Sequence, residues 1–158
     1  MDFHQVLSEV LVGAYPASIE DIDHLRQKVG VTAVLNLQTD EDIKRLGCDW
    51  RTLSAHYRRS KMAVRRVSVR DFDAEDLRRK LPDCVQALGE LLRKGHTVYV
   101  HCTAGLGRSP SVVVTYLHWV HQLDLDRAVK AVQQCRPCSP NLEAIRLASQ
   151  DLLGECAA

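Results

Sequence analysis

The sequence predicts an α/β fold in which a central, mainly parallel sheet is flanked by helices. Three apolar runs of strand length, Val10–Gly13, Thr32–Leu37 and Thr97–His101, are separated by longer segments in which apolar residues recur at helical spacing. Strands that alternate with helices along a chain form a parallel sheet with helices packed on its faces. A chain of 158 residues without a repeat or linker has the size of one domain, so we expect a single domain over residues 1–158.

In the first half of the chain, cap and turn residues mark where the elements begin and end. Ser18–Asp21 has the pattern of a capping box and predicts a helix that ends near Gly30. Thr39–Asp42 predicts the start of a short helix that ends at Gly47. Val67–Val69, within a basic region, has the composition of a short strand.

The second half of the chain is mostly helical. Leucines and valines recur at helical spacing over Ala74–Lys94, and Asp73 is the expected N-cap of this helix. An apolar helix is predicted from Arg108 to about Gln122. Asp124 caps the next predicted helix, and Ser139, followed by proline, opens the last one.

Composition and charge narrow the classes of function. The chain is 46% hydrophobic and 26% charged, as in ordinary globular proteins, so we expect a soluble intracellular monomer. No apolar run approaches the roughly 18–20 residues of a membrane span, and the first residues do not resemble a signal peptide. The basic run over residues 51–80 lacks interleaved aromatic residues, and aromatic residues make up only 5% of the chain, which argues against a nucleic-acid partner. Residues 51–80 hold ten Lys or Arg and four Asp or Glu, which indicates a solvated face or a positive rim that attracts an anionic substrate.

The six cysteines do not have the spacing of a disulfide framework. Cys135 and Cys138 form a C-x-x-C pair, but no second pair or spaced histidines complete a zinc site. We therefore interpret this pair as structural and expect neither a metal ion nor an organic cofactor.

The segment YVHCTAGLGRSP carries the strongest chemical signal. It runs from a strand through two glycines into a helix, which is where parallel sheets bind ligands. Gly105 and Gly107 let successive backbone N–H groups point inward as an anion nest, and the helix N-terminus adds its positive dipole. Arg108 can clamp a phosphate with a bidentate fork, and Cys102 at the floor of this electropositive loop is expected to be a nucleophilic thiolate.

The motif His101-Cys102-x-x-Gly105-x-x-Arg108-Ser109 resembles the signature of the cysteine-dependent dual-specificity phosphatases, within the protein tyrosine phosphatase superfamily. The resemblance implies that fold, a phosphocysteine intermediate and a general acid some thirty residues upstream, for which it indicates Asp71. The implied phosphate-binding residues are Thr103, Ala104, Gly105, Leu106, Gly107 and Arg108. The implied supporting residues are His101 and Ser109.

Three further segments, LVGAYPASIEDIDHL, RDFDAEDLR and RPCSPN, are similar to the plant glucan phosphatases and more distantly to laforin. This resemblance covers nearly the whole catalytic domain and implies a phosphorylated, starch-like glucan as substrate. It gives Phe72 and Phe3 as candidate substrate contacts. It includes no carbohydrate-binding module, and a plastid location would follow for a plant-type enzyme, although the chain shows no transit peptide.

One departure from the glucan enzymes keeps other substrates open. Arg45 and Leu46 stand before Gly47, where those enzymes carry an aromatic pair that can stack on sugar rings. A phosphoprotein substrate is therefore the alternative. A phospholipid substrate, or a pseudoenzyme that only binds phosphate, is the further alternative.

Overall fold

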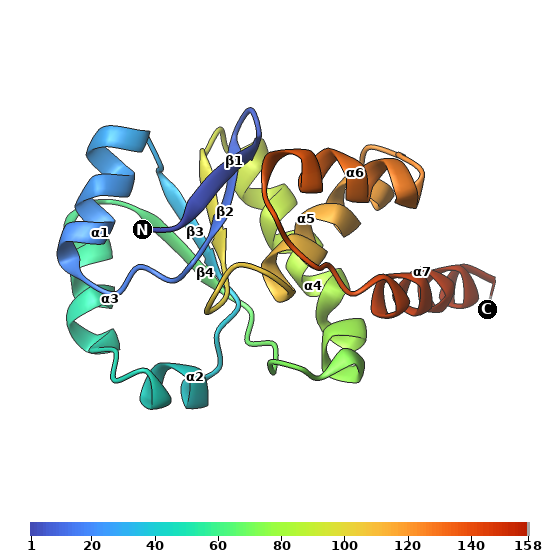
Figure 1. Ribbon diagram of the computed structural model, residues 1–158, viewed down its shortest axis with the longest axis horizontal. Coiled ribbons are helices and arrows are strands. Elements are labelled where there is room, and N and C mark those ends of the chain that lie inside the picture. The colour runs from blue at the N-terminus through green and yellow to red at the C-terminus, as the bar shows by residue number, and fades with distance from the viewer. Residues whose placement is uncertain (158) are drawn as a thin grey trace.

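The computed structural model describes residues 1–157 and contains one five-stranded sheet with the strand order β1-β2-β5-β3-β4 (Figure 1). The strands are β1 (Phe3–Leu7), β2 (Val10–Gly13), β3 (Ala33–Asn36), β4 (Ala63–Arg66) and β5 (Val98–His101). β1 pairs antiparallel with β2, and all other neighbouring pairs are parallel. The predicted fold class is therefore confirmed, and the carboxyl ends of β2, β3 and β5 meet at one edge of the sheet.

Helices cover both faces of the sheet (Figure 1). They are α1 (Ile19–His24), which continues into the π-helical turn η1 (Leu25–Val29), α2 (Asp40–Arg45), α3 (Trp50–Arg59), α4 (Ala74–Arg93), α5 (Arg108–Trp119), α6 (Leu125–Cys135) and α7 (Leu142–Ala157). Among the described helices, none has both the length and the apolar character needed to cross a bilayer.

The two faces of the sheet form two separate hydrophobic cores. Val34 and Tyr99 point into a smaller core with α1, η1 and α3, whereas Leu35 and Val100 point into a larger core with α4 and α5. Successive residues of a strand face opposite ways, so a strand buried on both faces must be apolar throughout. This explains why β3 and β5 are continuous apolar runs.

The strand predicted at Val67–Val69 is wrong in its position, because the structure places β4 at 63–66. Arg65 and Arg66 interrupt the apolar pattern that would have predicted a strand at this position. In the structure Arg65 forms an ion pair with Glu90, and Arg66 forms one with Asp40. The N–H groups of Val67 and Val69 still bond to the end of β3, but as an extended connection rather than a strand.

The last helix begins later than predicted. Ser139 does not open it: its N–H donates to the carbonyl of Leu106, 2.7 Å away, which holds the chain away from helical geometry. The helix starts instead at Leu142, and the Asn141 side chain accepts from the N–H of Ala144 in the manner of an N-cap.

The start of α4 fixes the loop that precedes it. Asp73 caps the helix as predicted, because its carboxylate accepts from the N–H of Asp76 at 2.9 Å. The buried carboxylate of Asp76 in turn accepts from the N–H of Arg70 and from Lys80. Burial alone would raise the pKa of Asp76, but these hydrogen bonds and nearby charges outweigh it and hold the pKa below its usual value. The loop between Arg70 and Asp73 is thus tied at both ends.

The loop between β5 and α5 lies directly against the backbone of β2. Gly105 has a φ of 72°, in the left-handed region, and a Cβ atom added there would overlap the backbone of Gly13. Only glycine satisfies both conditions at this position.

We expect Gly105→Ala to lower the free energy of unfolding by about 1–3 kcal/mol from backbone strain alone, with the overlap adding to the loss. Gly107→Ala is the matched control, because its φ is −123° and no atom lies within 4 Å of the added Cβ. Urea denaturation should show a change of less than about 0.5 kcal/mol for this control. Equal losses for the two variants would contradict the close approach of the two backbones.

Candidate active site

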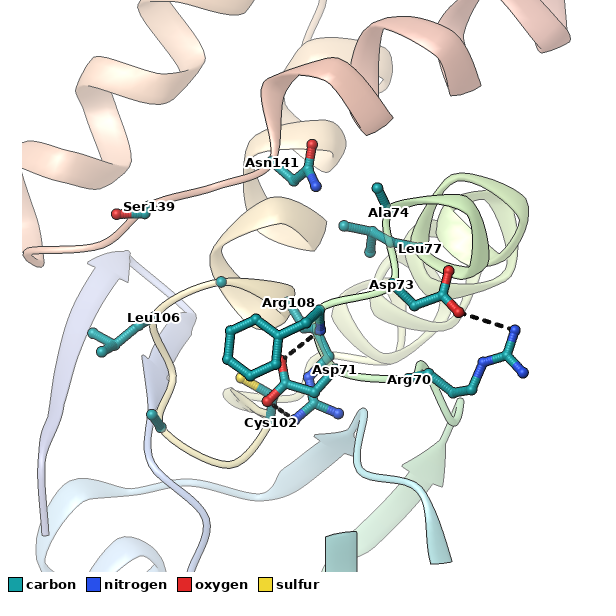
Figure 2. Close-up of a pocket in the computed structure, with 13 residues that line it drawn as sticks. Arg70, Asp71, Asp73, Ala74, Leu77, Cys102, Leu106, Arg108, Ser139 and Asn141 are labelled. Carbon is teal, nitrogen blue, oxygen red and sulfur yellow. Dashed lines mark hydrogen bonds and ion pairs between the residues drawn. The ribbon is translucent and has the colours of Figure 1, made fainter. Parts of the chain in front are cut away.

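A pocket of about 520 Å³ opens at the carboxyl edge of the sheet (Figure 2). Three segments line it: the β5–α5 loop, the loop before α4, and the approach to α7. The structure brings together the predicted residues Asp71, Phe72, Cys102, Leu106 and Arg108 around this pocket. Ser139 and Asn141, which were not predicted as site residues, also line it.

The backbone of the β5–α5 loop is turned so that its carbonyl groups point away from the pocket. Each carbonyl from residue 103 to residue 106 accepts a hydrogen bond from outside the loop. The contacts are Tyr15 N–H to Thr103 O (3.0 Å), Arg136 Nη2 to Ala104 O (3.0 Å), Arg136 Nε to Gly105 O (2.8 Å) and Ser139 N–H to Leu106 O (2.7 Å).

The N–H groups of the same loop are free to bind a ligand. Among the described residues, no N–H group from Thr103 to Ser109 has an acceptor. The C=O and N–H of one trans peptide point in opposite directions, so outward carbonyls leave the N–H groups facing inward. Gly107, the N-cap of α5, makes no side-chain cap, and the positive end of this helix faces the same space. The loop is thus built to receive an anion.

Cys102 lies at the floor of this loop and is 3% exposed. Its Sγ is 3.3 Å from the Oγ of Ser109, whose hydroxyl can donate to a thiolate. His101 is buried beside it, and burial lowers the pKa of this histidine to about 4. The ring is therefore neutral near pH 7 and donates from Nδ1 to the carbonyl of Cys102, 2.9 Å away, which orients the start of the loop.

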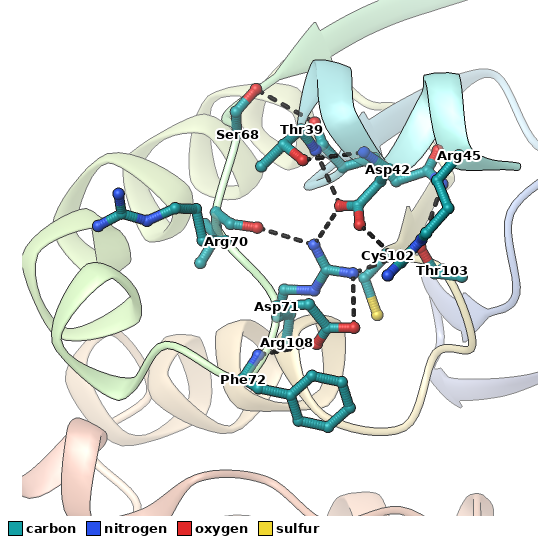
Figure 3. A network of polar contacts seen from close by, with 12 residues as sticks. Thr39, Asp42, Arg45, Ser68, Arg70, Asp71, Phe72, Cys102, Thr103 and Arg108 are labelled. Atoms are coloured by element: carbon teal, nitrogen blue, oxygen red, sulfur yellow. Dashed lines mark hydrogen bonds and ion pairs between the residues drawn. The ribbon is translucent and has the colours of Figure 1, made fainter.

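The guanidinium of Arg108 makes its shortest contacts through Nη1 (Figure 3). Nη1 donates to the carboxylate of Asp42 and to the carbonyl of Val69, both at 2.7 Å. Nη2 lies 3.3 Å from Asp71 and 3.4 Å from the hydroxyl of Thr103. Nε is buried without a partner among the described residues. Buried donors are almost always paired, so this one indicates a ligand site.

Asp42 is a site residue that the sequence analysis missed. It was identified only as part of a helix cap, and the structure confirms the reciprocal bonds of that cap with Thr39. The same carboxylate also binds Arg108 and Arg45. Burial would raise the pKa of Asp42, but the hydrogen bond from Arg108 and its other partners outweigh it, and the pKa stays below its usual value.

Asp71 and Phe72 occupy the loop before α4, at the mouth of the pocket. Asp71 is partly exposed, and its carboxylate accepts from the N–H of Phe72 as well as facing Arg108. Phe72 is fully exposed and has a φ of 55°, which is strained for a bulky residue. Leu106, 46% exposed, lies on the β5–α5 loop that lines the same pocket.

Other sequence-based candidates lie elsewhere. Phe3 is not among the residues that line the pocket and instead packs against Tyr99 and His24, so the structure places it at the smaller core. Of the ten cations in residues 51–80, only Arg70 lines the pocket. The positive rim stays a prediction for the others, with a solvated face as its alternative. Among the described residues, no three His, Cys, Asp or Glu side chains gather closely enough to hold a metal ion.

Comparisons with known proteins identify relatives over most of the chain. The phosphoglucan phosphatase DSP4, amyloplastic, of Castanea sativa is 36% identical over 155 residues, which cover 97% of this chain and 41% of that protein. Laforin of Mus musculus is 33% identical over 147 residues, which cover 87% of this chain and 44% of that protein. The chain spans only between 26% and 44% of the length of the curated phosphoglucan phosphatases and laforin that it matches.

A solved structure shares the fold of this chain. The crystal structure of PTPMT1 superposes with a TM-score of 0.77 at 24% identity and covers 98% of both chains. The family described as dual specificity phosphatase, catalytic domain, matches residues 11–148. With its cysteine loop, helix N-terminus and arginine in the arrangement described above, the chain belongs to the dual-specificity phosphatase catalytic-domain family.

Proposed function

We propose that the chain is a phosphomonoesterase that acts through a phosphocysteine intermediate and removes phosphate from a phosphorylated glucan. One observation carries the reaction class. A buried cysteine lies beneath an arc of free N–H groups, beside an arginine whose buried Nε has no partner among the described residues. Such an arrangement binds a phosphoryl dianion and aims a sulfur atom at its phosphorus.

In the first step the Cys102 thiolate attacks phosphorus, an S–P bond forms, and the P–O bond to the substrate alcohol breaks. The N–H groups of the loop and the Nε and Nη2 edge of Arg108 hold the three phosphoryl oxygens, on which charge develops. Asp42 and the Val69 carbonyl keep the other edge of Arg108 fixed, so the fork is already oriented before the substrate binds. Asp71 gives its proton to the departing oxygen.

In the second step water attacks phosphorus, the S–P bond breaks and inorganic phosphate is formed. The Asp71 carboxylate accepts the proton of the attacking water, and the Ser109 hydroxyl stabilises the departing thiolate. Asp71 suits both steps because it lies beside Arg108 at the pocket mouth.

The glucan assignment rests on two supports. Relatives that match nearly the whole chain bear the printed description phosphoglucan phosphatase. The exposed Phe72 and the half-exposed Leu106 offer apolar surface at the pocket mouth, and sugar rings stack on aromatic faces. A phosphoprotein substrate is the second candidate, because the charged Arg45 stands where the glucan enzymes resembled carry an aromatic residue.

Phosphate release from solubilised starch, a phosphotyrosine peptide and a phosphoinositide should decide the substrate class. We expect the highest kcat/KM on phosphorylated starch. Phe72→Ala should lower kcat/KM on starch about tenfold, because covering an exposed phenyl ring contributes about 1.5 kcal/mol at the lower end of its range. The same variant should change the rate on p-nitrophenyl phosphate by less than about twofold. A preference for the peptide or the lipid would reject the glucan assignment but not the chemistry.

Cys102→Ser should reduce turnover by at least about 10³-fold, because the nucleophile is lost. The protein should still fold and bind inorganic phosphate, since the loop and Arg108 are unchanged. Cys138→Ser is the matched control, because Cys138 is a free thiol outside the pocket, and it should keep full activity. Substantial residual activity in Cys102→Ser would mean that another group is the nucleophile.

Asp71→Asn should lower the rate on alkyl phosphates by about 10²–10⁴-fold, the range typical of general acid catalysis. The loss should be much smaller on p-nitrophenyl phosphate, whose leaving group departs readily as an anion. Asp73→Asn is the control, because asparagine can still cap α4 and should change mainly stability, and only slightly. If Asp73→Asn shows the loss that depends on the leaving group, Asp71 is not the acid.

A further inference from the structure

Arg136, just after α6, is 1% exposed and is the largest fully buried side chain of the described residues. It lies behind the β5–α5 loop, on the side away from the pocket, and all five of its N–H donors are used. The contacts are Nε to Gly105 O (2.8 Å), Nη2 to Ala104 O (3.0 Å), Nη2 to Asp2 Oδ2 (2.9 Å), Nη1 to Asp2 Oδ1 (3.1 Å) and Nη1 to His4 Nδ1 (3.0 Å).

A buried guanidinium is costly unless it is paired and fully hydrogen-bonded. Asp2 supplies the opposite charge as a bidentate partner, and the hydrogen bond from Arg136 holds the pKa of Asp2 below its usual value. His4 contributes an unprotonated Nδ1, because a guanidinium can only donate. The segment that leads into β1 therefore neutralises a charge whose other contacts are on the active-site loop.

The two carbonyls that Arg136 binds determine where two N–H groups point. The peptide between Ala104 and Gly105 has its C=O held outward, so the N–H of Gly105 must face the pocket. The next peptide has the carbonyl of Gly105 held outward, so the N–H of Leu106 must face the pocket as well. Gly105 gives the backbone unusual rotational freedom at this point, so the loop needs an external constraint here.

We propose that Arg136 is a positioning residue for phosphate binding, which fixes the N–H groups of Gly105 and Leu106 toward the phosphoryl group, with Asp2 as its counter-ion. The inference rests on the proposed phosphatase function. A residue that only joined α6 to β1 would affect stability. A positioning residue must also affect affinity for the anion itself.

The first test measures the dissociation constant of inorganic phosphate by calorimetry in the Cys102→Ser protein, so that turnover plays no part. Adding Arg136→Met should weaken phosphate binding about 10- to 100-fold, because two hydrogen bonds to a charged group are lost or misaligned. Arg78→Met is the matched control. Arg78 makes a similar bidentate pair, with Asp151, at 2.7 Å for both contacts, but it touches no part of the loop. It should change phosphate affinity by less than about twofold even if it lowers the melting temperature.

The second test uses turnover in proteins that retain Cys102. Arg136→Met should lower kcat/KM by the same factor on p-nitrophenyl phosphate and on alkyl phosphates, because the loop holds the phosphoryl group in every substrate. This distinguishes it from Asp71→Asn, whose effect depends on the leaving group. Arg136→Lys keeps the charge but has three donors instead of five, so it should be intermediate in phosphate affinity. If Arg136→Met does not fold, the phosphate affinity of Arg136→Lys tests the positioning role instead.

Phosphate affinity within twofold of the reference in a folded Arg136→Met or Arg136→Lys protein would overturn the inference and leave the proposed function intact. A loss that depends on the leaving group would also overturn it. A reference Cys102→Ser protein that binds no phosphate at millimolar concentration would overturn the proposed function, and the inference with it.

Discussion

The β5–α5 loop can bind an anion only while its carbonyl oxygens point away from Cys102, and no residue within the loop keeps them there. The donors that hold them come from Tyr15 after β2, Arg136 after α6 and Ser139 before α7. These three points are far apart in the sequence and are brought together only by the complete fold. The loop sequence itself supplies the glycine and the nucleophile. Residues outside the loop turn its carbonyl groups outward and so leave its N–H groups facing the pocket.

A second constraint acts on Arg108 through α2. The carboxylate of Asp42 closes the helix cap with Thr39 and binds Nη1 of Arg108, so one side chain has a local role and a distant one. Because α2 follows β3 in the chain, the orientation of the arginine depends on the strand that neighbours β5. The site is thus assembled by parallel neighbours in the sheet, whose carboxyl ends lie side by side. This is the usual place for ligands in α/β proteins.

Much of this arrangement was accessible from the sequence, for identifiable reasons. β2, β3 and β5 are buried on both faces and are therefore apolar up to Asn36 and His101 at the ends of β3 and β5, and α4 has a strong apolar period with an Asp73 cap. β1 and β4 are the two edge strands of the sheet and contain polar or charged residues such as Gln5, Arg65 and Arg66, so their apolar patterns are weak. The anion-binding loop can be identified from the sequence because its residues, from Cys102 to Arg108, follow one another in a single segment. Asp42, Arg136 and Ser139 reach the loop only through tertiary contacts, and no local pattern reports such contacts.

The close contact between β2 and the active-site loop has a consequence for how this chain can vary over time. A side chain at Gly13 would overlap Asp2 and Phe3 of the N-terminal segment and the hydroxyl of Tyr99, and Gly105 meets the same backbone from the other side. Gly13 belongs to a strand and has no chemical role, yet it has as little room to change as a residue that touches substrate. Substitution of Gly13 is blocked by two segments, the N-terminal segment and β5, so no single compensating substitution can make room for a side chain. We therefore expect substitutions at Gly13 to be tolerated as rarely as substitutions in the β5–α5 loop, and more rarely than substitutions elsewhere in β2.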